Sequence, residues 1–341
     1  MKKLQEDYSL RQKRIIADRI KRKTRGKAKK KARDEKQRLS NYRVIPAPET
    51  ILLQPNFGFA DGSIGFVNDI GELARTEKRV LLDFSDTKFM SALGSVYLYS
   101  EINNIIDSHG TTVRIKGHDK MRRQVRNLLR NSGILQLCGY LDEPDPDAFF
   151  PIRRGDDDKD VEKITRGVVA RRKQTNLDDP NYAESLTYKA ISEAMLNVKQ
   201  HAYPTDNNRF WWATAAISKE DIHIALCDRG VGIPQTLSTS RILSNIVRGL
   251  SLGNDDAKMI QAAMVYTRSS RQEGFGTGLG SRDIQNLVLD EGKGHLTIIS
   301  GKGHYRLNGD NTESIEKISY DVGGTLIQWQ IPLKRSTGGR T

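Results

Sequence analysis

Glu193 and Asn197, which lie four residues apart, are two side chains of this 341-residue chain that could do chemistry together. The apolar residues from Ser185 to Ala202 recur at helical spacing, so both polar side chains fall on one stripe of the predicted helix, together with His201. The amide oxygen of Asn197 is a hard ligand that suits Mg²⁺ beside phosphate oxygens. The Glu193 carboxylate could orient or deprotonate a water molecule. For this segment alone, an ordinary helix with a polar edge is the alternative.

A second group of residues lies at the end of a predicted strand. The apolar run from Ile222 to Cys227 indicates a strand, and Asp228 follows it directly. Gly230 and Gly232 allow a tight turn in which the backbone comes close to a ligand. A carboxylate held at such a turn can accept a hydrogen bond from an exocyclic amine, which favours adenine over guanine. Taken alone, Asp-x-Gly-x-Gly is also a common turn sequence.

The third group is a glycine-rich loop, from Gly274 through Gly276 and Gly278 to Gly280, that precedes a predicted helix. Such a loop presents backbone N–H groups and the positive end of the helix to phosphates. A dinucleotide-binding fingerprint would follow the first strand of a βαβ unit, whereas this loop follows a long helical stretch. A P-loop is excluded because Gly-Lys-Ser or Gly-Lys-Thr does not follow at the required spacing.

In this order, Glu-x-x-x-Asn, Asp-x-Gly-x-Gly and Gly-x-Gly-x-Gly-Leu-Gly resemble the motifs of the GHKL ATPase superfamily. That superfamily includes gyrase, heat-shock chaperones, histidine kinases, anti-sigma serine kinases and mismatch-repair ATPases. The resemblance extends from Ala183 to Leu333. It implies that ATP and Mg²⁺ are the ligands, that Asn197 holds the Mg²⁺, that Glu193 is the catalytic base and that Asp228 reads the adenine.

The resemblance also assigns roles to residues around the three motifs. Thr325, which follows two glycines and precedes the last predicted strand, would assist near the adenine through a water molecule. Residues 235–273 would form a lid over ATP, in which Arg268 and Arg271 could reach a terminal phosphate. The alternative is a pair of surface arginines on a mobile loop. The other expected binding residues shape the pocket floor or cap the phosphates: Gly230, Gly232, Gly274, Gly276, Gly278, Leu279 and Gly280.

Upstream, residues 41–142 alternate between strand and helix patterns, which predicts a small α/β domain. Residues 82–85, the turn from Phe89 to Gly94 and the helix end at Ser132-Gly133 resemble the STAS family of anti-sigma-factor antagonists. The resemblance implies a domain that binds a protein partner. The chain departs from the family at Leu93, where a phosphorylatable Ser is usual, so we expect docking or scaffolding rather than a phospho-switch.

Together these patterns predict a mixed α/β chain in which a STAS-like domain precedes a two-layer α/β sandwich of the GHKL type. The connection is placed in a Pro- and Asp-rich stretch, because Pro disfavours helix and clustered carboxylates repel one another. The predicted parts are a basic arm over 1–40, helical or disordered, the STAS-like domain over 41–142, a linker over 143–165, the ATP-binding domain over 166–335 and a disordered tail over 336–341.

The basic charge of the chain is concentrated in its N-terminal arm. Residues 1–40 contain 17 Lys and Arg and 5 Asp and Glu, so they carry +12 of the net charge of +13. Such a segment cannot bury enough apolar surface to offset its ordering entropy. It could bind nucleic acid by releasing counterions, contact an acidic protein partner, or serve only solubility.

Cysteine usage and hydropathy set the expected compartment. Cys138 and Cys227 lie in unrelated contexts, which argues against a disulfide framework or a zinc site. No apolar run approaches the ~18 residues that a membrane span requires, and the N-terminus lacks a secretory pattern. We therefore expect a cytoplasmic protein without membrane contact, and the pairing of the two resemblances suggests a bacterial one.

Binding of ATP leaves the reaction open. The interpretation we favour is a conformational switch in which ATP closes the lid and Glu193 supports hydrolysis, and a homodimer is compatible with it. One alternative is a protein kinase, either a serine/threonine kinase of the anti-sigma type or a histidine kinase, for which His118 is a weak candidate acceptor. Another is an ATP-gated scaffold without turnover.

The arm leads to a first prediction. If it binds nucleic acid, deletion of residues 1–40 will weaken DNA and RNA binding at low salt and flatten the salt dependence, because phosphate contacts release counterions. A gel-shift series at rising salt, run on the full chain and on the truncated chain, measures both effects. Equal affinity before and after the deletion would remove nucleic acid from the partners of the arm.

Overall fold

The structure is a computed structural model that describes residues 39–54, 58–117, 121–144, 149–155, 158–173, 180–204, 209–218, 220–239, 255–269 and 280–332. Its helices and strands confirm the predicted mixed α/β class. Most of the predicted arm and all of the predicted tail lie outside these ranges. Among the described residues, no helix is both long and apolar enough to cross a lipid bilayer.

By its contacts the chain divides into two units, Met1–Val44 and Ile45–Thr341. In the first unit only residues 39–44 are described, as a turn and the start of strand β1 (Arg43–Pro46). The remaining elements all belong to the second unit. This unit contains nearly all of residues 41–142 and the whole of residues 166–335, which the sequence predicts as separate domains.

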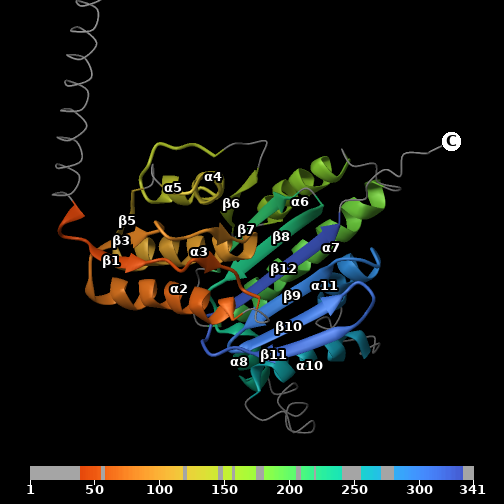
Figure 1. The fold of residues 1–341 in the computed structure, drawn as a ribbon. Helices are drawn as coiled ribbons and strands as arrows, with labels where there is room; N and C mark the ends of the chain where they lie inside the picture. Colours follow the sequence, from red (N-terminus) through yellow and green to blue (C-terminus); the bar gives the residue numbers. More distant parts are fainter. Residues whose placement is uncertain are drawn as a thin grey trace, which may run out of the picture. The chain divides into compact units, whose positions relative to one another are not determined.

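A seven-stranded sheet is the largest sheet of the described fold (Figure 1). Its strands follow the order β11-β10-β9-β12-β8-β7-β6, and neighbouring strands run antiparallel. β12 lies between β8 and β9, in a register that sets Thr325 opposite both Asp228 and Ser300. The strands are β6 (Phe149–Gly155), β7 (Trp211–Ile217), β8 (Asp221–Asp228), β9 (His295–Ser300), β10 (Gly303–Asn308), β11 (Glu313–Lys317) and β12 (Thr325–Pro332).

Helices cover one face of this sheet (Figure 1). Ile327, Trp329 and Ile331 alternate along β12, and they form one core with apolar side chains of α7 and α11, as expected for a strand with one face against helices. The indole Nε1 of Trp329 donates to the carbonyl of Ile284 at 2.8 Å, so the indole is buried without losing its hydrogen bond. The elements here are α6 (Asp158–Lys173), α7 (Pro180–Asn197), η2 (Val198–Ala202), α8 (Gly232–Thr239), α10 (Asp256–Ser269) and α11 (Gly280–Leu289).

Residues 43–142 form a three-stranded sheet and a separate parallel pair of strands, with helices beside them. β3 pairs with β5 in the sheet β1-β3-β5, and β2 pairs with β4. β3 is an apolar strand with Val80 and Leu82 in the core. The elements are β2 (Thr50–Ile51), α2 (Phe59–Thr76), β3 (Arg79–Asp83), β4 (Phe89–Met90), α3 (Ala92–His109), β5 (Thr112–Lys116), α4 (Arg123–Asn131) and α5 (Ile134–Leu137).

Helix α3 joins the two halves of the unit. It begins where the Ser91 hydroxyl accepts a hydrogen bond from the Gly94 amide, and it ends at Gly110 in the left-handed conformation. Beyond its contacts with α2, it packs on β7, β8 and β12. Apolar side chains of these strands, such as Cys227 and Leu326, therefore belong to the same core as α2 and α3.

The stretch 143–165, which the sequence suggests as a linker, contains β6 and the start of α6. β6 forms the edge of the seven-stranded sheet and pairs with β7 from Phe149↔Ala216 to Gly155↔Trp211. The register shifts between Phe150 and Arg153. Backbone pairing at an existing edge, rather than a strong apolar pattern, thus places these residues in the sheet.

One hydrogen bond between α3 and the sheet gives a stability prediction. The buried Trp212 indole donates from Nε1 to Oδ1 of buried Asn103 at 2.9 Å. Asn103→Ala leaves this N–H without its partner and should lower the free energy of unfolding by about 1–3 kcal/mol. Urea unfolding followed by circular dichroism and by Trp fluorescence measures the change.

The neighbouring residue on α3 provides the control. Asn104→Ala alters a half-buried side chain that contacts only Ser108 among the hydrogen bonds described, so we expect little effect. In both variants the two probes should report one coincident transition, because α3 and the sheet share a core. Two separated transitions would contradict a single cooperative unit.

Candidate functional site

Asp228, the last residue of β8, is a buried carboxylate held by backbone and hydroxyl donors. Its Oδ1 accepts from the Gly230 amide at 2.8 Å, and the amide and hydroxyl of Thr325, opposite it on β12, act on it as donor groups. Burial raises the pKa of Asp228 to about 6, although these hydrogen bonds act to lower it. The structure thus places Asp228 and Thr325, which the sequence assigns to one site, opposite each other on neighbouring strands.

Glycines allow three segments to meet at this carboxylate. A Cβ on Gly230 would overlap the Ala202 carbonyl, and a Cβ on Gly324, whose φ is +132°, would overlap the Asp228 carbonyl. The Val231 amide also donates to Ala202 at 2.8 Å. The end of η2, the turn after β8 and the turn before β12 are thus in direct backbone contact, at a distance that only Gly permits.

Ser300, at the end of β9, completes the described part of the site, and sequence reasoning missed it. Its fully buried hydroxyl donates to the Gly324 carbonyl at 2.8 Å, lies 3.1 Å from the Thr325 hydroxyl and accepts from the Ile233 amide at 2.9 Å. A single Ser after an apolar strand is no signal by itself. Only the register of β9 against β12 reveals its role.

Glu193 and Asn197 lie on the last turn and a half of α7, which packs against α11. Burial raises the pKa of the half-buried Glu193 carboxyl, and the negative charge of Asp283 on α11 raises it further. After Asn197 the helix widens into the π-helical turn η2, a feature that often marks functional sites. Asp283 is a second acidic residue of this site that the sequence reasoning did not single out.

The described residues thus form two groups that η2 connects. Asp228, Gly230, Gly232 and Thr325 come together at the end of β8, while Glu193 and Asn197 lie on the helix that leads to Ala202 at the same turn. His201 lies exposed within η2.

The rest of the predicted site is covered only in part. Gly280 is the first residue of α11, and Arg268 falls within α10. Five of the predicted residues lie outside the described residues: Arg271, Gly274, Gly276, Gly278 and Leu279. Of the predicted lid, residues 235–273, the structure therefore describes the start, which lies in α8, and a later part that includes α10.

The donor set of the site suits a hard cation beside an anion. Asn197 offers an amide oxygen, and Glu193 and Asp283 offer carboxylates whose mutual repulsion a divalent cation would relieve. Within the described part of the chain, no three His, Cys, Asp or Glu side chains gather as a metal site. Mg²⁺ that is bound together with phosphate needs only one or two protein ligands.

No protein-family model matches the chain, and no curated protein matches it significantly.

The raised pKa of Asp228 gives a prediction for stability. Because this pKa is higher in the folded protein than its ordinary 3.8, the folded state favours the protonated carboxyl, and that stabilisation is lost as pH rises from about 4 through about 6. Asp228→Asn cannot ionise, so its stability relative to the wild type should increase by about 2–3 kcal/mol over this window. Urea unfolding of both proteins at a series of pH values measures this, and a constant difference would contradict it.

Proposed function

We propose that this site binds ATP with Mg²⁺ and hydrolyses the nucleotide, and that binding acts as a conformational switch for a protein partner on the STAS-like segment. The observation that carries the proposal is the convergence at Asp228. A carboxylate that is 4% exposed is costly to bury, yet it lies where three glycine-containing or helix-ending segments meet. Buried carboxylates with perturbed pKa values are typical of functional sites.

Adenine recognition is the first role we assign. The Asp228 carboxylate accepts hydrogen bonds only, so it is complementary to the exocyclic amine of adenine and repels the carbonyl oxygen that guanine has at that position. Thr325 lies opposite Asp228 in the sheet, and Ser300 holds the Thr325 hydroxyl at 3.1 Å, so this hydroxyl can order a water molecule between protein and base. The glycines keep the surrounding backbone close to a flat ligand.

Glu193 and Asn197 supply the chemistry in this proposal. Asn197 would hold Mg²⁺, which neutralises charge on the phosphates when it is bound. The raised pKa of Glu193 brings it closer to neutral pH, where a carboxylate is a better general base toward an attacking water molecule. Gly280 at the start of α11 would direct the N-terminal amides of that helix toward the phosphates.

The described serine candidates favour hydrolysis over phosphorylation within the chain, and His118 lies outside the described residues. Leu93 has no hydroxyl and is buried. The nearby hydroxyls are engaged: Ser91 caps α3, and the fully buried Ser95 donates to the Ala92 carbonyl at 2.7 Å. Transfer to a separate protein would still appear as label retained on that protein.

The proposal predicts separable effects of two substitutions. Glu193→Gln should preserve nucleotide binding and lower turnover by about 10²–10⁴-fold, since a general base is lost. Asp228→Asn should weaken binding of ATP, because an amide can present a donor to the adenine amine. Calorimetry with Mg-ATP measures binding, and release of free phosphate from γ-labelled ATP measures turnover.

Glu162→Gln is the matched control, because Glu162 is an exposed glutamate on α6 that pairs with Arg166. It should bind and hydrolyse ATP like the wild type. Normal hydrolysis by Glu193→Gln would disprove the assignment of the base. Absence of any calorimetric signal from the wild-type protein with adenine nucleotides would overturn the proposed function itself.

A further inference from the structure

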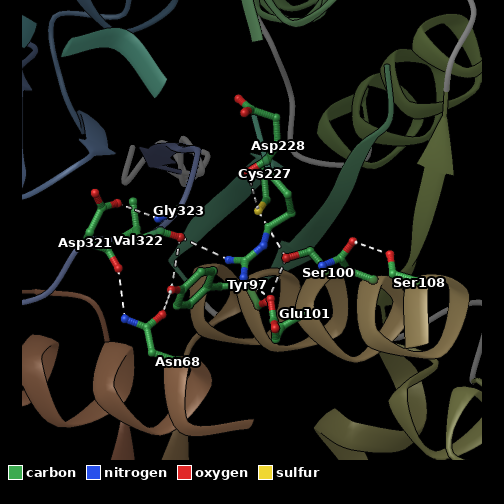
Figure 2. Close-up of polar contacts among 12 residues, drawn as sticks. Asn68, Tyr97, Ser100, Glu101, Ser108, Cys227, Asp228, Asp321, Val322 and Gly323 are labelled. Atoms are coloured by element: carbon green, nitrogen blue, oxygen red, sulfur yellow. Dashed lines mark hydrogen bonds and ion pairs between the residues drawn. The ribbon is translucent and has the colours of Figure 1, made fainter. Parts of the chain in front are cut away.

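Arg229, the residue after Asp228, extends into a buried polar network beneath the site. Its guanidinium forms an ion pair with Glu101 of α3, and the two side chains are only 14% and 5% exposed. The Nη1 of Arg229 donates to the Val322 carbonyl at 3.0 Å, and its Cζ lies 5.2 Å from the centre of the Tyr97 ring. Figure 2 shows the carboxylate of Asp228 directed away from Tyr97 and Glu101.

The same network holds the turn that precedes β12. The hydroxyl of Tyr97 lies 3.1 Å from the Val322 carbonyl and 3.3 Å from Oδ1 of Asn68 on α2. The side-chain amide Nδ2 of Asn68 donates to the backbone carbonyl of Asp321 at 3.0 Å (Figure 2). Helices α2 and α3 therefore contact the backbone of residues 321–322, shortly before Gly324, which approaches Asp228.

The Glu101 carboxylate packs closely against Gly71 of α2. A Cβ added at Gly71 would overlap Oε1 of Glu101, which is the end of a flexible side chain. The carboxylate is thus enclosed between α2, Arg229 and its own helix. A methyl group at residue 71 would displace it while leaving both charges of the pair in the protein.

These contacts join the two turns of the site to one pair of helices. Arg229 is covalently next to Asp228, and Val322 is two residues before Gly324, whose backbone touches Asp228. A shift of the Glu101 carboxylate therefore moves the Arg229 side chain and releases the Val322 carbonyl. Both changes act on the position of the Asp228 carboxylate, although neither Glu101 nor Arg229 is directed at the place of a ligand.

We propose that Glu101 is a positioning residue of the nucleotide site: through Arg229 and Val322 it sets the geometry of the adenine-reading turn, so that helices α2 and α3 control nucleotide affinity. This inference rests on the proposed function. It differs from a merely structural brace, which would change the stability of the protein and leave the affinity of its folded fraction as it was. A surface change on α2 or α3 would reach the site along the same path.

The test measures nucleotide affinity by calorimetry with Mg-ADP and with a non-hydrolysable ATP analogue. Glu101→Gln and Gly71→Ala should each raise the Kd about tenfold, which corresponds to a coupling of about 1.4 kcal/mol. The factor should be the same for both nucleotides, because the effect arises at the adenine end. In steady-state hydrolysis the KM should rise while kcat changes little.

Two variants serve as matched controls. Gly62→Ala also lies on α2, but an added Cβ there meets nothing within 4 Å. Asp107→Asn removes an exposed ion pair of α3 with Arg154. Both should keep the wild-type Kd and kcat.

The outcomes separate this inference from the proposed function. If the wild type binds adenine nucleotide and both Glu101→Gln and Gly71→Ala bind it with unchanged Kd, the positioning role is wrong and the proposed function stands. If the wild type binds none, both fall. Should Glu101→Gln fail to fold, Gly71→Ala and Tyr97→Phe decide, since each keeps the charged pair; unchanged Kd in both overturns the inference.

Discussion

Two backbone turns, one after β8 and one before β12, approach each other closely around the buried carboxylate of Asp228, and the fold is arranged to keep them there. A carboxylate there is removed from water, so it requires donors from its own turn and from the neighbouring strand. Those donors reach it only if the strands lie in one register and the turns lack side chains. The strand register and the glycines therefore hold Asp228 in place, and Ser300 acts one step further out by binding Gly324 and Thr325.

Helices cover both faces of the seven-stranded sheet, and each face contributes residues that hold the region around Asp228 in place. On one face, α7 and α11 bury the alternating apolar residues of β12 and bring Glu193 and Asn197 toward the same turn. On the other face, α3 contributes polar side chains to the interface, where Glu101 pairs with Arg229 and Asn103 with Trp212. Buried polar contacts of this kind specify one docking geometry more strictly than apolar packing does, because each unpaired group would be costly. Helices α2 and α3 are for this reason part of the site's framework.

Much of the local structure could be predicted from the sequence, since it depends on short-range periodicity. The apolar run before Asp228 forms β8, the helical stripe with Glu193 and Asn197 forms α7, and the residues after Ser91 form α3. The strand β6 could not be foreseen, because prolines and aspartates obscure its pattern and an existing sheet edge creates it. Ser300 and Asp283 were missed because each is a lone polar residue whose partner is distant in the chain.

The sequence alone establishes which side chains are available for chemistry: a Glu and an Asn on one helical stripe, a carboxylate followed by glycines after a strand, and a basic N-terminal segment. These follow from residue type and from spacing over a few positions, which local geometry translates directly into structure. Only the packing in three dimensions unites residues 45–142 and the seven-stranded sheet in one core, sets the buried Asp228 opposite Thr325, and brings Glu101 to Arg229 across 128 positions of the chain. Contacts at such separation depend on register and packing, and no local pattern of residues encodes them.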